Sequence, residues 1–413
     1  MITSMVRITL CGLASALLGL SVFLTIAHSQ AREVKVALLA PLSGPLAREG
    51  ELMRIGAQMA VEDINAQGGI AALGGARMKL IVDDAGDKVE TAKNAAQRLV
   101  ANEPDVVAGT GAWSSSFTLA ITEVTERAGI PWLTLSYADQ ITSRGFKYVI
   151  QTGPVASSIA LDAMPTVLGM AERATGKRPQ AVAIISDSSA APQSFLKPLR
   201  DGGFDKLGVK IVADEVFTSP LSDATAMVQK LRTTRPAFLV MYVLGFSDCK
   251  LIVAKMNEFG LRGRIIPVSI GVQMASPEML NALGPTVLEG LISVAANWTS
   301  KSQQGILPGL TRRSKEPWLG QNTMSTYGDM WLIKDAIERA RSADRNRVNA
   351  ALHATDLEHG KGPAMYYVGN KLAFDASGRR IGGAVTLVQW QGGQPVTIWP
   401  EKEAFAPPFW PTK

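Results

Sequence analysis

The sequence predicts an α/β protein with two lobes, each built around a doubly wound parallel sheet. Two observations lead to this prediction. Short runs rich in β-branched residues alternate with amphipathic stretches of helical length, which is the pattern of consecutive βαβ units. After residue 152 the pattern starts again, and 413 residues are more than one such unit needs.

The elements of the first lobe follow one another closely. Strands are expected over 34–40, 78–84, 106–108, 130–136 and 148–152, with helices over 47–66, 89–101 and 116–128. The first helix places Leu52, Ile55 and Met59 on one face. Because ligands bind beyond the carboxyl ends of the strands in open α/β sheets, the four loops at 41–45, Asp84, 114–116 and 136–139 are expected to share one edge.

A second doubly wound unit follows. Strands are expected over 181–187, 209–215, 237–243 and 264–270, and the helices between them begin or end near Val155, Phe195, Ser222 and Met256. A long helix over 325–340 has an apolar stripe that includes Trp331, which is expected to pack in the core. Strands at 372–375, 384–390 and 395–399 are separated by turns and are expected to be antiparallel.

The first 31 residues have the composition of an export signal. Arg7 is their only charge, residues 8–27 form an apolar run, and small residues stand at positions 27, 29 and 31. We therefore expect cleavage after Ser29 or Ala31 and a periplasmic location. The apolar run is also long enough to remain as an uncleaved membrane anchor, and this alternative stays open.

Composition limits the functions available to the chain. The net charge of +6 falls to +5 when Arg7 is removed, and lysines and arginines are scattered among acids, so nucleic-acid binding is not expected. Only Cys249 remains after processing, so no internal disulfide can form. His353 and His359 lack metal-ligand spacing, and no G-x-S-x-G elbow or Walker loop is present, so no metal, cofactor or catalytic residue is expected.

The stretch from 104 to 120, PDVVAGTGAWSSSFTLA, combines a short strand, a glycine turn, three serines and a helix. Gly109 and Gly111 permit close approach of the backbone, and the serine hydroxyls lie beside the unpaired N–H groups of a helix start. This arrangement favours an anion site, although a serine N-cap explains the same residues. A dinucleotide fingerprint is disfavoured because Ser114 replaces the third glycine and Trp113 is bulky.

Several motifs in a specific order carry a family resemblance over the mature chain. They are LLAPLSGPLAREGEL, LIVDDAGD, VVAGTGAWSSSFTLA, AGIPWLTLS, FKYVIQTGP, AVAIISD and TYGDMWLIKDAIERA. The chain resembles the exported solute-binding proteins of ABC transporters, in the branched-chain amino acid receptor family. The resemblance implies a type I periplasmic-binding fold, with three hinge strands crossing near Gly153, Asn297 and Gly362 and a ligand cleft between the lobes. Residues 32–153 plus 297–362 would form one lobe, and 154–296 plus 363–413 the other.

The resemblance also implies ligand contacts. The serine that binds a carboxylate in the family falls on Ser115, or on Ser114 if the register slips by one, and a second carboxylate loop falls on 136–138. An aromatic position of the family falls on Ala191, and the acid that receives an α-ammonium group falls within 268–273, which contains no acid. The expected contacts are therefore Trp113, Ser114, Ser115, Ser136, Tyr137, Ala138, Ala191, Phe246 and Ile270.

The leading hypothesis is a receptor, not an enzyme, that captures a small carboxylate-bearing solute, closes around it and presents it to an inner-membrane permease. It is expected to be a monomer. Asp187 or Asp248 could reach the cleft from neighbouring loops and receive an ammonium group. The alternatives are an extracellular sensing domain and, less favoured, a secreted hydrolase using Ser115, which lacks a persuasive general base.

Overall fold

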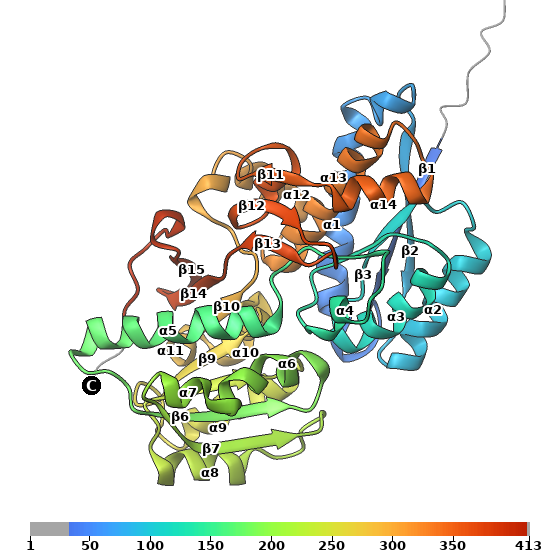
Figure 1. The fold of residues 1–413 in the computed structure, drawn as a ribbon. Coiled ribbons are helices and arrows are strands. Elements are labelled where there is room, and N and C mark those ends of the chain that lie inside the picture. The colour runs from blue at the N-terminus through green and yellow to red at the C-terminus, as the bar shows by residue number, and fades with distance from the viewer. Residues whose placement is uncertain (1–32, 411–413) are drawn as a thin grey trace, which may run out of the picture.

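A computed structural model of the protein describes residues 33–410. Two separate sheets, each covered by helices on both faces, form two lobes that lie side by side (Figure 1). The export signal expected over residues 1–31 lies outside the described residues. Within residues 33–410, no helix is both long enough and apolar enough to cross a membrane.

The first sheet has five parallel strands in the order β2-β1-β3-β4-β5. Its strands are β1 Glu33–Ala40, β2 Arg77–Asp84, β3 Ala108–Gly111, β4 Trp132–Thr134 and β5 Val149–Gln151, and its helices are α1 Ala47–Ala66, α2 Val89–Asn102, α3 Ser115–Arg127 and α4 Gln140–Ser143. The strand order reverses between β1 and β3, which creates a crevice at the carboxyl ends of these strands. The serine turn leaves β3 at this point.

The glycines of β3 are explained by close packing within the first sheet. A Cβ atom on Gly109 would lie 2.4 Å from the ring of Trp132, and one on Gly111 would lie 2.0 Å from the carbonyl oxygen of Leu39. Close packing inside the first lobe therefore accounts for both glycines, and the expected approach of a ligand to their backbone is not needed to explain them. The strand expected at 106–108 begins two residues later in the structure.

The second sheet has seven strands in the order β15-β14-β10-β9-β8-β6-β7. Its strands are β6 Ala181–Asp187, β7 Lys210–Phe217, β8 Phe238–Tyr242, β9 Ile266–Ile270, β10 Ile292–Ala295, β14 Thr386–Gln391 and β15 Gln394–Trp399. Strands β6 to β10 are parallel, while β14 and β15 are antiparallel as expected. The helices are α5 Ala156–Thr175, α6 Ala190–Pro198, α7 Phe204–Lys206, α8 Thr225–Thr234, α9 Phe246–Glu258, α10 Pro277–Leu283 and α11 Pro285–Leu288.

The chain returns to the first lobe through α12 Leu307–Ser314 and α13 Gln321–Ala340, which packs along α1, and continues into α14 Arg345–His353. A small antiparallel sheet follows, made of β11 Asp356–Glu358, β12 Gly369–Phe374 and β13 Arg380–Gly383 (Figure 1). Leu372 and Phe374 of β12 belong to the hydrophobic core of the first lobe.

The chain passes between the two sheets three times, after β5, after β10 and after β13. This confirms the expected fold of two doubly wound lobes and a three-segment hinge. The third passage differs from the expectation near Gly362, because β12 pairs with β11 and β13 and keeps Leu372 in the first lobe. The passage therefore follows Gly383. Residue-level boundaries at 153 and 297 stay predictions.

Polar contacts fix the passages relative to one another. The Nδ2 group of Asn297 donates to the Oγ atom of Ser325 at 3.1 Å and to the carbonyl of Tyr366 at 2.9 Å. The buried guanidinium of Arg380 donates to the carbonyl of Thr152 at 3.1 Å and to that of Val368 at 2.7 Å. These hydrogen bonds tie the three passages to one another and to the first lobe.

Candidate functional site

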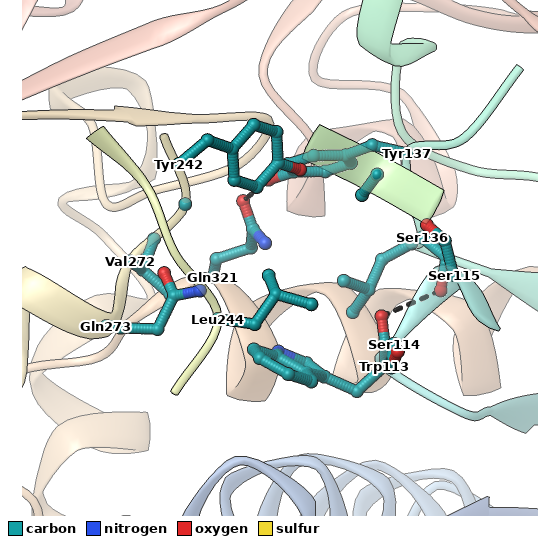
Figure 2. A pocket seen from close by; sticks show the side chains of 13 residues that line it. Trp113, Ser114, Ser115, Ser136, Tyr137, Tyr242, Leu244, Val272, Gln273 and Gln321 are labelled. Carbon is teal, nitrogen blue, oxygen red and sulfur yellow. Dashed lines mark hydrogen bonds between the residues drawn. The ribbon is translucent and has the colours of Figure 1, made fainter. Parts of the chain in front are cut away.

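The serine turn has an unusual backbone. Ala112 and Trp113, which directly follow β3, adopt left-handed conformations with φ of 72° and 54°. Such conformations cost about 1–3 kcal/mol each for residues other than glycine, and they occur most often at binding and catalytic sites. The turn brings the Trp113 ring to the space between the lobes and aims the start of α3 at the same space (Figure 2).

Helix α3 begins at Ser115, with Ser114 in the N-cap position. The Ser114 side chain makes no cap hydrogen bond, so an ordinary serine cap does not account for this hydroxyl. The N–H groups of the first helical turn have no partners within the helix, and they carry the positive end of the helix dipole. The start of α3 therefore combines backbone donors with two serine hydroxyls.

The second carboxylate loop joins the serine turn by direct hydrogen bonds. The Ser115 hydroxyl oxygen accepts the backbone N–H of Ala138 at 3.1 Å. The Ser136 hydroxyl donates to the carbonyl of Trp113 at 2.8 Å and lies 2.7 Å from the hydroxyl of Thr118. The proton of Ser136 is thus already used within the protein, whereas that of Ser115 remains free to donate.

A small cavity lies between the lobes in front of this turn. Its lining is formed by Trp113, Ser114, Ser115, Leu135, Ser136, Tyr137, Ala191, Tyr242, Leu244, Gly271, Val272, Gln273 and Gln321. The serines occupy one side and the two glutamines the opposite side, with aromatic and aliphatic side chains between them (Figure 2). None of these lining residues is an acid or a base, so the cavity is neutral, apart from the dipole of α3.

The second lobe contributes cavity-lining residues from the carboxyl ends of β8 and β9. Tyr242 ends β8 and packs edge-on against Phe195 at 5.4 Å between ring centroids. Burial raises the pKa of Tyr242 well above its usual value, so its phenol stays protonated. Residues 271–273 follow β9, and Ala191 lies in the first turn of α6.

Gln321 links the cavity to the hinge. Its Oε1 atom accepts the backbone N–H of Ala296 at 2.9 Å and the hydroxyl of Tyr137. The Tyr137 hydroxyl oxygen is also 3.2 Å from the N–H of Ala296. These bonds connect the second carboxylate loop, the second passage and the first residue of α13.

Six of the nine sequence-predicted contacts line the cavity: Trp113, Ser114, Ser115, Ser136, Tyr137 and Ala191. The other three do not. Ala138 is buried beside Ile141 and Val149, and it reaches the site only through its N–H group. Phe246 is half-buried against the core of the second lobe, and Ile270 points into that core from β9.

Seven lining residues were not among the expected contacts: Leu135, Tyr242, Leu244, Gly271, Val272, Gln273 and Gln321. Of these, Gly271, Val272 and Gln273 fall within the stretch 268–273 where the ammonium-binding acid of the family was expected. The rule that ligands bind beyond strand ends could have found Tyr242 and Leu244, because the strand was expected to end at residue 243. Gln321 gave no such signal, because it precedes the helix that the sequence predicted from residue 325.

Neither candidate ammonium partner reaches the cavity. The Asp187 carboxylate accepts the N–H of Leu244 at 2.7 Å and that of Ser189 at 2.9 Å. Asp248 accepts the hydroxyl of Ser219 at 2.6 Å and the N–H of Leu221 at 2.9 Å. Both acids therefore fix loops of the second lobe instead of facing a ligand.

The described residues supply the cavity with neither a metal site nor a histidine base. Within residues 33–410, no cluster of three or more His, Cys, Asp or Glu side chains could hold a metal ion. His353, at the end of α14, has its Nε2 atom 2.9 Å from the carbonyl oxygen of Lys147. Neither His353 nor His359 is among the cavity-lining residues, so the lining offers Ser115 no histidine base.

A family model described as "Periplasmic binding protein" matches residues 33–394. The chain belongs to this family. Among curated relatives, the "Leu/Ile/Val-binding protein homolog 8" of Brucella melitensis biotype 1 is 28% identical over 408 residues, covering 95% of this chain and 97% of that protein. These matches confirm the resemblance drawn from the motifs, and they identify a binding protein and not an enzyme.

Solved structures show the same fold. The branched-chain amino acid binding protein LivJ of Streptococcus pneumoniae, in complex with isoleucine, has a TM-score of 0.74 at 19% identity and covers 89% of this periplasmic binding protein and 100% of its own chain. A solute-binding protein of R. palustris in complex with benzoate has a TM-score of 0.73 at 17% identity, with 92% and 99% covered. Both confirm the type I periplasmic-binding architecture.

Proposed function

We propose that this periplasmic binding protein captures a small solute that carries a carboxylate and lacks an α-ammonium group. The observation that supports it is the pairing of an α3 start rich in donors with a cavity that is otherwise neutral. A carboxylate at the serine turn would accept hydrogen bonds from the Ser115 hydroxyl and from first-turn N–H groups, and the helix dipole favours its charge.

The rest of the cavity suits an apolar body. Trp113, Leu135, Leu244 and Val272 present ring and methyl surfaces, so an aromatic or branched aliphatic skeleton would be well packed. An ammonium group would find no carboxylate on the lining, and burying it unpaired costs several kcal/mol. This argument favours a deaminated carboxylate over an amino acid.

Delivery of the solute to a permease would depend on the closing of the two lobes around it. The two lobes contact each other through the Arg48 Nε atom of α1, which lies 2.8 Å from the Glu278 carboxylate of α10. A second contact between the lobes is the hydrogen bond that the N–H of Asp139 donates to the Ser194 hydroxyl of α6 at 3.2 Å. A ligand that touches both lobes favours this closed state, which an inner-membrane permease can then distinguish from the open one. We further propose that the protein works as a periplasmic monomer.

The direct test is to identify what the protein retains. Mature protein purified from its native host without denaturant should release a carboxylate without an amino group, detected by mass spectrometry of the denatured supernatant. A retained amino acid would contradict the proposal. The Ser115→Ala variant, prepared in parallel, should release much less of the same compound.

A further inference from the structure

The side of the cavity opposite the serine turn carries two primary amides without protein partners for their inward-facing groups. Gln273 and Gln321 are each about 3% exposed, so both amides are withdrawn from bulk solvent. Figure 2 shows their side chains converging on the cavity from the left, across from Ser114 and Ser115. Polar groups buried this deeply normally have hydrogen-bond partners.

The orientation of the Gln321 amide is fixed by its neighbours. A backbone N–H can only donate, and the N–H of Ala296 points at one end of this amide at 2.9 Å. That end must therefore be Oε1, and the Nε2 group faces the cavity (Figure 2). Within residues 33–410, Nε2 donates no hydrogen bond to a side chain or to a backbone carbonyl, so it offers its protons to whatever fills the cavity.

Gln273 supplies the complementary group. Its Oε1 atom is buried and has no hydrogen-bond partner within the described residues. A Cβ atom on Gly271 would lie 2.4 Å from it, so this glycine leaves room for the amide. Since a terminal amide can turn by 180° at little cost when neither end is bonded, Gln273 can present either an acceptor or a donor to the cavity. The two side chains therefore offer a ligand one hydrogen-bond donor of fixed orientation, Nε2 of Gln321, and one amide, that of Gln273, that can either donate or accept.

We propose that Gln273 and Gln321 select a solute with a hydroxyl group at the end remote from its carboxylate; this inference rests on the proposed capture of a carboxylate. A hydroxyl both accepts and donates, so it can accept from Nε2 of Gln321 and donate to Oε1 of Gln273. A solute without it leaves both amides unpaired and buried, and sites built to bond a hydroxyl reject such analogues strongly.

The test uses two matched pairs on ligand-stripped protein: benzoate with 4-hydroxybenzoate, and hexanoate with 6-hydroxyhexanoate. In at least one pair the hydroxylated member should bind at least tenfold more tightly in calorimetry. The Gln273→Met variant, and Gln321→Met, in which the Tyr137 hydroxyl oxygen can still accept the Ala296 N–H, should each reduce that ratio to less than threefold. Gln193→Met, an exposed glutamine of α6, should keep the ratio.

The outcomes separate the two proposals. Equal affinities within both pairs overturn the distal hydroxyl site and leave carboxylate capture standing. A high ratio that survives both glutamine variants overturns the assignment to Gln273 and Gln321. Binding of none of the four acids overturns carboxylate capture itself, and the inference falls with it.

Discussion

The hydroxyl oxygen of Ser115 accepts the backbone N–H of Ala138 at 3.1 Å, so one side chain joins the two loops expected to hold a carboxylate. This contact leaves the Ser115 proton free for a ligand. Ser115 also stabilises the fold, since removing its hydroxyl leaves a buried N–H without a partner.

Replacing Ser115 by alanine should therefore weaken binding more than it destabilises the fold. Loss of one hydrogen bond to a charged carboxylate costs about 1.5–3 kcal/mol, which is a tenfold to over a hundredfold loss of affinity. Calorimetric titration with the ligand found on the purified protein measures it. Ser116→Ala removes a hydroxyl from the same helical turn outside the cavity and should leave affinity unchanged. Equal affinities of wild type and Ser115→Ala would refute the assigned contact.

The absence of acids from the cavity lining predicts a preference between matched ligands. Leucine and 4-methyl-2-oxopentanoate, then phenylalanine and 3-phenylpropionate, should be titrated against ligand-stripped protein. Each deaminated acid should bind at least as tightly as its amino acid, because an unpaired buried ammonium costs several kcal/mol. If either amino acid binds tenfold more tightly, a difference of about 1.4 kcal/mol, an ammonium site exists.

Arg48 makes two ion pairs with different expected consequences for closure. Glu278 lies on α10 of the second lobe at 2.8 Å, whereas Glu316, at 2.5 Å, precedes α13 on the side of the first lobe. Glu278→Gln should favour the open state and lower affinity by up to about fivefold, because half-exposed pairs contribute up to about 1 kcal/mol. Glu316→Gln is the matched control and should not shift the balance. Small-angle scattering and titrations at low and high salt measure both effects.

Glu49 predicts a pH dependence of stability. Burial is the main reason that its pKa rises from 4.5 to about 7, a rise opposed by Arg48 and by the hydrogen bond from Asn322. Glu49 then binds its proton more tightly in the native state than in the unfolded chain. The resulting contribution to the free energy of unfolding is complete below pH 4.5 and is lost as pH rises to about 7. Its full size is about 3 kcal/mol.

Urea unfolding of wild type and Glu49→Gln at pH 4.5 and pH 8 tests this sign. The variant stays neutral, so wild type should lose about 3 kcal/mol of stability relative to it over that interval. The comparison between the two proteins cancels the titration of other buried acids, such as Asp329, whose pKa burial raises to about 6. A difference that does not change with pH would show that the pKa of Glu49 is not raised in the native state.

Export can be examined independently. In its native host, most of the protein should begin near Gln30 or Arg32 and appear in the periplasmic fraction, because Arg7 and the apolar run resemble a cleaved signal. Terminal sequencing and fractionation provide the measurement. An intact Met1 terminus in the membrane fraction would instead favour the anchored sensing domain.

Local sequence patterns predicted most strands of the two main sheets and the longer helices, but not β10, α12 or α14. The expected helix over 47–66 matches α1 residue for residue, and the expected strand over 181–187 matches β6, because hydrophobic periodicity reports which face of an element is buried. The serine turn was also predictable, since the rule for parallel sheets places the residues after β3 and β4 at one edge. Ser115 and Ser136 come together there, as expected.

Contacts between distant segments were decided only by the tertiary structure. The sequence could not show that Asp187 and Asp248 are occupied by backbone N–H groups, because those partners lie on other loops. Nor could it show that Gln321 faces the cavity, which depends on the second passage bringing Ala296 to its Oε1 atom. A one-dimensional pattern records which residues are buried, whereas the partner that each buried polar group finds depends on how the lobes close.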